Sequence, residues 1–244
     1  QPLDPKKDKQ VMLNHYSVAV SPADGSIWAT VLGYPGSIIR VVPGADPAHT
    51  ALTEIYEPPM PGYGPRGGDI GKDGVFWLSL SSGHLASFDR RKCKVTNGPT
   101  ATGGHCREGW TLHQFPGPQM PDVKDPGSAE TSYYVWVDWF NVLGLGENVP
   151  IALGSNSDSL KAFVPGSKQH VIMRVPYPLG FYTKWLDGRI DDPDHAQQSV
   201  RAVPDDTRVE PRGASPHGRG ELRGDLDRFV VTNIHGADRE LGVH

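Results

Sequence analysis

The sequence DGSIW, at Asp24–Trp28, returns 49 residues later as DGVFW, at Asp73–Trp77. In both copies an Asp-Gly turn signal leads into β-branched and aromatic residues, which is the composition of a strand that begins at a hairpin. A motif that returns at this distance indicates an architecture built from repeated units. We therefore expect each copy to open the second strand of a repeat.

Other strands of the repeat can be placed around these two copies. Third strands are predicted at Gly36–Gly44, Gly83–Asp89 and Asp158–Gly166. Each is followed by an alternating segment that ends in proline, which an outer edge strand tolerates because it can lose a hydrogen-bond donor. These predicted fourth strands are Thr53–Pro59, Leu112–Pro118 and Met173–Pro178. The predicted first strands are Tyr16–Val20, Arg66–Ile70, Tyr133–Asp138 and Phe181–Leu186.

Three complete units and the start of a fourth predict an all-β fold, a β-propeller of four-stranded antiparallel blades with few or incomplete blades. A β-sandwich is the alternative, but it does not account for the returning motif. We assign residues 1–194 to the blades. Residues 195–244 contain seven arginines and one aromatic residue, Phe229, so we expect a peripheral or partly disordered tail.

The composition limits the class of protein and its partners. The chain has 244 residues, 37% of them hydrophobic, and a formal net charge of -4. This charge provides no basic surface for nucleic acid, and no apolar run is long enough to cross a bilayer. We expect neither nucleic acid nor membrane as a partner. The chain begins at Gln1 and shows no signal peptide, as expected of a processed product or an excised piece.

The stretch GPRGGDIGKDGVFWLSL, at Gly64–Leu80, resembles the blade signature of the streptogramin B lyases, also called virginiamycin B lyases. The segment TEIYEPP, at Thr53–Pro59, resembles the end of a blade in that family. The resemblance covers roughly Val11–Asp194 and extends to the related gluconolactonase-type propellers. It implies a propeller fold. Arg66 stands where the family motif has histidine, and no residue here matches the family's catalytic histidine and glutamate.

The strand order predicts where a site would lie. Loops from a fourth to a first strand and from a second to a third strand share one rim, and the resemblance implies that this rim carries the chemistry. His15 and Arg66 stand there, where two first strands begin. We predict His15 as a general base and Arg66 as a cation that stabilises an oxyanion. The alternative for His15 is a structural or solvated histidine.

Three oxygen-bearing side chains are predicted to bind a divalent cation, and calcium is favoured over magnesium. Asn156 and Asp158 are close together in the connector GSNSD, and Asp69 lies in a first strand near the expected channel. Carboxylate and amide oxygens are the ligands that such hard cations prefer. Two alternatives remain open. Asn156 and Asp158 could hydrogen-bond a tight turn, and Asp69 could pair with a backbone donor or with Arg66.

The aromatic and cysteine residues add two predictions. Tyr63, Tyr133 and Tyr182 are expected to line a substrate pocket, although aromatic residues on blades are often core. Cys93 and Cys106 bracket an insertion between a third and a fourth strand, and the hairpin brings them together, so we expect a disulfide. The bond indicates a periplasmic or secreted protein. We expect the insertion on the rim opposite the site.

These features predict a metal-dependent hydrolase that opens a lactone or another cyclic ester, for example an N-acyl-homoserine lactone. The resemblance offers a second function, a streptogramin-type C–O lyase. A third is a non-catalytic propeller module that binds another chain. Because the repeat is unfinished, we also expect a second copy of the chain or a partner to complete the ring.

Overall fold

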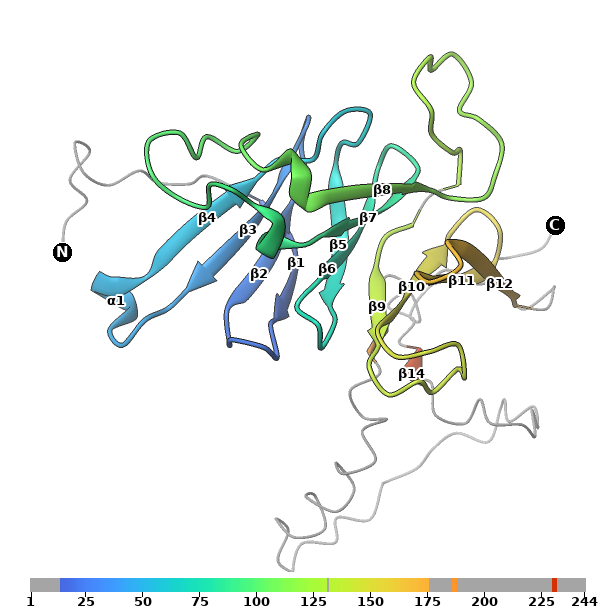
Figure 1. The fold of residues 1–244 in the computed structure, drawn as a ribbon. Coiled ribbons are helices and arrows are strands. Elements are labelled where there is room, and N and C mark those ends of the chain that lie inside the picture. Colours follow the sequence, from blue (N-terminus) through green and yellow to red (C-terminus); the bar gives the residue numbers. More distant parts are fainter. Residues whose placement is uncertain (1–13, 131, 176–185, 188–229, 232–244) are drawn as a thin grey trace, which may run out of the picture.

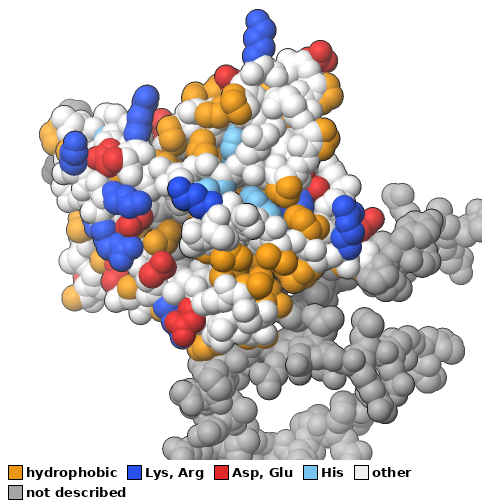
Figure 2. Space-filling view, turned by 45° about the vertical axis from the view of Figure 1, so that its right-hand side comes forward, with side chains coloured by type: hydrophobic (Ala, Val, Ile, Leu, Met, Phe, Trp, Pro, Cys, Tyr) orange, Lys and Arg blue, Asp and Glu red, His pale blue; other side chains and the backbone are white. Residues whose placement is uncertain are grey.

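The computed structural model describes residues 14–130, 132–175, 186–187 and 230–231. The strands form three separate four-stranded sheets. These sheets follow one another along the chain (Figure 1; a space-filling view is given in Figure 2). In each sheet the strands pair antiparallel in sequence order. Within the described residues, the one α-helix is the short α1 (Pro47–Thr50), and no helix is long and apolar enough to cross a membrane.

The first sheet contains β1 (His15–Val20), β2 (Ile27–Val31), β3 (Ser37–Val42) and β4 (Leu52–Tyr56). The second contains β5 (Pro65–Ile70), β6 (Phe76–Leu80), β7 (His84–Phe88) and β8 (Trp110–Gln114). The third contains β9 (Val135–Asp138), β10 (Val149–Gly154), β11 (Ser159–Val164) and β12 (Gln169–Arg174). The three predicted units and their strand order are confirmed.

One predicted strand was placed too late. The fourth strand of the third unit was expected at Met173–Pro178, whereas β12 begins at Gln169 and ends at Arg174. The turn before it is tight, because the Lys168 amide donates to the Val164 carbonyl at 2.8 Å and Lys168 has a positive φ of 56°. Pro165 and Gly166 do signal this turn, but the strand was placed at the later run that ends in proline, as the other two fourth strands do, and its start was missed.

The three first strands lie side by side at the centre. β1 lies beside β5, and β5 lies beside β9. The Gly68 amide donates to Ser17 Oγ at 3.1 Å, and the Gly67 amide donates to the Tyr133 carbonyl at 2.7 Å. A Cβ at Gly67 would lie 2.2 Å from the Tyr134 ring, so the close approach of β5 and β9 requires glycine there. Sheets that meet through their first strands are the blades of a β-propeller.

Two short strands are described beyond the third blade. The two-residue strand β13 (Leu186–Asp187) lies beside β9 and pairs with β14 (Val230–Val231). Leu186 ends the segment predicted as a fourth first strand, and the rest of that segment lies outside the described residues. Most of 195–244 also lies outside them, so the peripheral role expected for this tail stays a prediction.

The tryptophans of the repeated motif join neighbouring blades. Trp28 is 2% exposed and its ring lies 5.4 Å from that of Phe76 in the second blade. Trp77 is 6% exposed and its ring lies 5.8 Å from that of Phe163 in the third blade. The same position in two successive repeats therefore fills the space between one blade and the next, which explains why the motif returns.

Cys93 and Cys106 form the predicted disulfide. The insertion that they bracket does not stay at the rim where it begins. Arg90 Nε donates to Glu54 Oε2 at 2.6 Å, and further along the loop the Gly103 carbonyl accepts from the Glu57 amide at 2.9 Å. The loop thus runs along β4 and reaches the rim that carries the β4–β5 loop, so the expectation that it lies on the rim opposite the site was wrong. Glu54 and the Tyr56 ring, at the outer edge of the first blade, are partners that hold it there.

Candidate functional site

Arg66 is held at the beginning of a central strand by the turn that follows β6. Its Nε donates to Ser81 Oγ at 2.9 Å, and Ser81 Oγ lies 3.1 Å from the Gly64 carbonyl. The Ser81 amide also donates to that carbonyl, at 3.0 Å. These contacts fix the guanidinium near the rim where β5 begins.

Aromatic rings from β1 and from the segment before β9 lie near this cation. The guanidinium carbon lies 4.7 Å from the centre of the Tyr133 ring. The Tyr16 and Tyr134 rings are 5.5 Å apart, and the Tyr134 hydroxyl donates to the Tyr16 carbonyl at 2.9 Å. We call Arg66, Tyr16, Tyr133 and Tyr134 the Arg66 cluster. It joins β1, β5 and the segment before β9.

Burial changes the electrostatics of the cluster. The pKa of Tyr16 is raised by its removal from water and by the neighbouring Tyr134, while Arg66 opposes the rise. Tyr16 therefore stays a neutral hydroxyl at physiological pH. Arg66 is partly buried, and within the described ranges it forms no ion pair with a carboxylate. A cation in this position can bind a carboxylate or polarise an ester carbonyl.

His15, the predicted base, is the first residue of β1 and lies opposite Val31. Its side chain is exposed, and among the described residues no hydrogen bond or ion pair joins it to the Arg66 cluster. The structure thus places His15 on the predicted central strand, with its side chain exposed. Its role as a base stays a prediction.

Both carboxylate oxygens of Asp69 bind backbone amides. Oδ1 accepts from the Ile70 amide at 2.8 Å, and Oδ2 accepts from the Val137 amide of β9 at 3.0 Å. These bonds tie the second blade to the third and match the backbone-donor alternative for this residue.

Asn156 and Asp158 lie together in the exposed turn between β10 and β11. The Asn156 side-chain Nδ2 donates to the Ala129 carbonyl at 2.9 Å, and the Asn156 backbone amide donates to Glu130 Oε1 at 3.1 Å. Asp158 has a positive φ of 44°, and its carbonyl accepts from the Val175 amide at 2.8 Å. The Asn156 contacts tie the turn to the segment before β9, and the Asp158 contact ties it to the residue after β12. They lie between segments rather than within the turn, so the tight-turn alternative stays a prediction.

The structure does not bring Asp69 to this turn. β10 runs antiparallel to β9, so its last residue, Gly154, lies past the beginning of β9, and the turn follows there. Asp69 binds the amide of Val137, near the end of β9. Within the described residues, no group of three or more histidine, cysteine, aspartate or glutamate side chains could hold a metal ion. The predicted ligand role of Asp69, Asn156 and Asp158 stays a prediction.

The predicted tyrosines have different surroundings. Tyr133 belongs to the Arg66 cluster. Tyr63 lies further out on the same rim, its ring 5.4 Å from that of Tyr34. Tyr182 lies outside the described residues. The sequence analysis did not single out Tyr16, Tyr134 and Ser81 as site residues. Their contacts in the Arg66 cluster join residues that are far apart in the chain. The one available signal was the position of Tyr16 at the start of a predicted first strand.

A second polar group is buried between the second and third blades. Lys161 Nζ lies 2.8 Å from Glu130 Oε2, and both side chains are almost fully buried. Burial lowers the pKa of Lys161, and the partner carboxylate opposes the fall. The His113 and His170 rings flank Phe163 at 4.2 and 5.0 Å. Burial lowers the pKa of both histidines, and that of His170 falls to about 4. His113, His170 and Lys161 thus form a second group of ionisable side chains at the contact between these blades.

The three blades and their central rim place the chain in the β-propeller class. No protein-family model and no curated protein matches it. Among solved structures, it is similar to selenomethionine-substituted virginiamycin B lyase from Staphylococcus aureus, with 11% identity and a TM-score of 0.37. It is also similar to a catalytically inactive variant of that lyase with quinupristin, with 13% identity and a TM-score of 0.33. Each match covers 68% of this chain and 57% of the other, so the chain spans little more than half of those proteins.

Proposed function

We propose that the chain supplies blades of a propeller enzyme that binds a cyclic ester at the Arg66 cluster and opens it by carbon–oxygen elimination. The observation that supports this proposal is the state of Arg66. Its guanidinium is fixed by Ser81, lies against Tyr133 and has no carboxylate partner in the described part of the chain. The motif at Gly64–Leu80, which resembles the streptogramin B lyases, supports the choice of a cyclic ester.

Elimination suits a site with a cation and a base. The base removes a proton from the carbon next to the alcohol carbon, and that electron pair forms a carbon–carbon double bond. The bond between the alcohol carbon and the ester oxygen breaks, and the carboxylate leaves with its electron pair. Arg66 would stabilise the negative charge that develops on the carboxylate. We propose His15 as the base because it lies on the neighbouring central strand.

Hydrolysis assisted by a divalent cation is the second candidate reaction, and we favour calcium over magnesium as the cation. Its proposed ligands are Asp69, Asn156 and Asp158. We rank it below elimination because Asp69 lies away from the turn that carries Asn156 and Asp158, so the three proposed ligands do not meet at one point. Asp69 would also have to exchange two backbone hydrogen bonds for the metal. For either reaction, the disulfide supports a periplasmic or secreted location.

Replacing Arg66 tests the proposal. In the Arg66→Gln variant we expect turnover of a streptogramin B cyclic ester, followed as loss of the cyclic species, to fall by about 100-fold or more, as when one oxyanion-stabilising donor is removed. Arg66→Lys keeps the charge and should retain part of the rate. Lys124→Gln removes a positive charge from an exposed loop and should match the wild type. Unchanged turnover in Arg66→Gln would contradict the proposal.

A further inference from the structure

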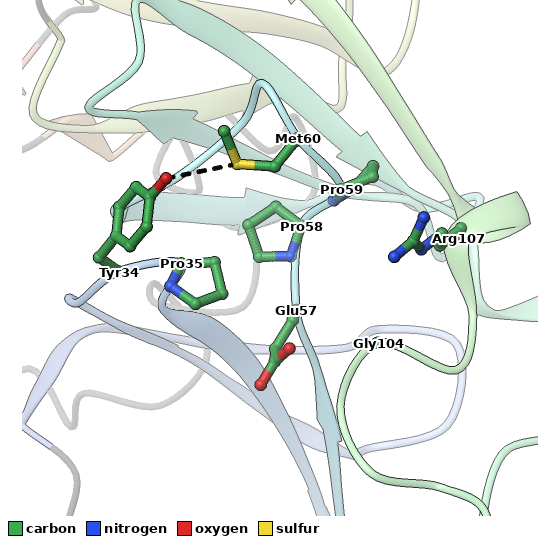
Figure 3. A pocket seen from close by; sticks show the side chains of 8 residues that line it. All are labelled: Tyr34, Pro35, Glu57, Pro58, Pro59, Met60, Gly104 and Arg107. Atoms are coloured by element: carbon green, nitrogen blue, oxygen red, sulfur yellow. Dashed lines mark hydrogen bonds between the residues drawn. The ribbon is translucent and has the colours of Figure 1, made fainter.

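A cavity lies on the same rim, next to the Tyr34 ring, which is 5.4 Å from that of Tyr63. It has a volume of about 250 Å³ and is built by three segments: the turn between β2 and β3, the loop between β4 and β5, and the disulfide-bonded loop (Figure 3). Its lining residues are Tyr34, Pro35, Glu57, Pro58, Pro59, Met60, Gly104 and Arg107. None of these belongs to the Arg66 cluster.

The cavity carries two opposite charges that do not meet. Glu57 and Arg107 both line it, yet among the described residues neither forms an ion pair. Figure 3 shows their side chains on different sides of Pro58. A carboxylate and a guanidinium each favour a ligand group of the opposite charge.

The position of Glu57 is set by the loop that the disulfide closes. Its amide donates to the Gly103 carbonyl at 2.9 Å. A Cβ at Gly103 would lie 2.8 Å from the Glu57 carboxyl carbon, so the carboxylate packs directly against the backbone of this loop. Arg107 follows Cys106 in the same loop. The disulfide-closed loop therefore packs against Glu57 and ends at the residue before Arg107.

The remaining wall is apolar and open. Tyr34 is 75% exposed and Met60 is 55% exposed, and the Tyr34 hydroxyl lies 3.8 Å from the Met60 sulfur. Pro35 and Pro58 extend this surface toward the charged pair (Figure 3). Exposed apolar side chains that border a polar cavity favour a ligand with an apolar part.

We propose that this cavity binds a small zwitterion of the α-amino-acid class with an apolar side chain. The ligand's ammonium group pairs with Glu57, and its carboxylate pairs with Arg107. Its side chain packs against Tyr34 and Met60. A ligand with a single charge would leave one of the two protein groups without a partner, which explains the preference for a zwitterion. The proposal does not depend on the reaction at Arg66.

Three related ligands test the charges one at a time. Leucine carries both charges, N-acetyl-leucine lacks the ammonium group, and leucinamide lacks the carboxylate. Titrations followed by calorimetry, up to about 10 mM ligand to cover millimolar affinities, should show binding of leucine. The two derivatives should bind at least about ten-fold more weakly, as expected when a charged hydrogen-bond partner is lost.

Matched variants assign each charge to its residue. Glu57→Gln should abolish the preference for leucine over N-acetyl-leucine, and Arg107→Gln should abolish the preference over leucinamide. Asp122→Asn and Lys124→Gln change exposed charges elsewhere and should bind leucine as the wild type does.

The proposal fails if leucine does not bind, if all three ligands bind alike, or if both cavity variants keep the wild-type preferences. None of these results alters the outcome expected for Arg66→Gln, so a failure here is separate from a failure of the proposed reaction.

Discussion

Acidification should weaken the contact between the second and third blades through His170. The His170 ring lies 5.0 Å from that of Phe163 and 6.1 Å from that of Phe115, and within the described residues its buried Nε2 has no hydrogen-bond partner. Burial lowers its pKa from 6.5 to about 4, and the nearby His113 and Lys161 contribute to the fall. His170 is therefore neutral in the folded protein at pH 7.

The sign of the effect follows from proton uptake. An unfolded histidine titrates near pH 6.5, so between that pH and about 4 the unfolded chain binds a proton that the folded chain does not. The free energy of unfolding therefore falls as the pH falls through this range. Above pH 6.5, neutral His170 makes its full contribution to the free energy of unfolding.

The size of the effect follows from the two pKa values. One pKa unit corresponds to about 1.4 kcal/mol, so the full difference for His170 is about 3 kcal/mol. Between about pH 7.5 and about pH 5, roughly 2 kcal/mol of this would be lost. Because the ring is partly exposed, we expect about 1 to 2 kcal/mol.

Urea unfolding at the two pH values, followed by tryptophan fluorescence, measures this loss. His170→Phe keeps an aromatic ring between Phe163 and Phe115 and removes the titrating group, so its loss on acidification should be about 1 to 2 kcal/mol smaller than that of the wild type. His49→Gln is the control, because His49 is exposed and pairs with Asp46 at a different part of the chain. Equal losses in His170→Phe and the wild type would refute the reasoning.

Three further predictions concern the packing of the blades. Replacing Cys93 and Cys106 by serine should lower the free energy of unfolding by about 3 kcal/mol, measured in urea, since the bond closes a loop of 13 residues' separation; labelling should find no free thiol in the unreduced wild type. Gly67→Ala should lower the melting temperature strongly because its Cβ would overlap Tyr134, whereas Gly166→Ala meets no atom within 4 Å and should not. Trp28→Ala should cost about 3 to 5 kcal/mol in urea unfolding, while Val18→Ala, at 64% exposed, should cost little.

The strands were predictable because their signals are local. The Asp-Gly turns at Asp24 and Asp73 precede β2 and β6 as expected, and the hairpin between Cys93 and Cys106 carries the predicted disulfide. The start of β12 was missed because the run that ends in proline, Met173–Pro178, was taken as the strand, although Pro165 and Gly166 signal the turn before Gln169. Turn residues thus locate a strand start better than the proline at its end.

The site was less predictable because its contacts cross between blades. The Tyr134 hydroxyl binds a carbonyl 118 residues earlier, and Arg66 meets Tyr133 only when β5 and β9 lie side by side. Arg66 and Tyr133 could be placed on the correct rim from strand order alone. The backbone partners of Asp69 could not, since the Val137 amide reaches it only after the blades pack.

The mass of the reaction product tests the central claim most directly. A streptogramin B cyclic ester is incubated with the purified protein, with and without a chelator, and the products are examined by mass spectrometry. The proposed elimination predicts a linear product with the same mass as the cyclic ester, formed equally in both samples and lost in Arg66→Gln. A product heavier by one water that disappears with chelator would contradict it and identify metal-dependent hydrolysis, and binding without any product would identify a binding module.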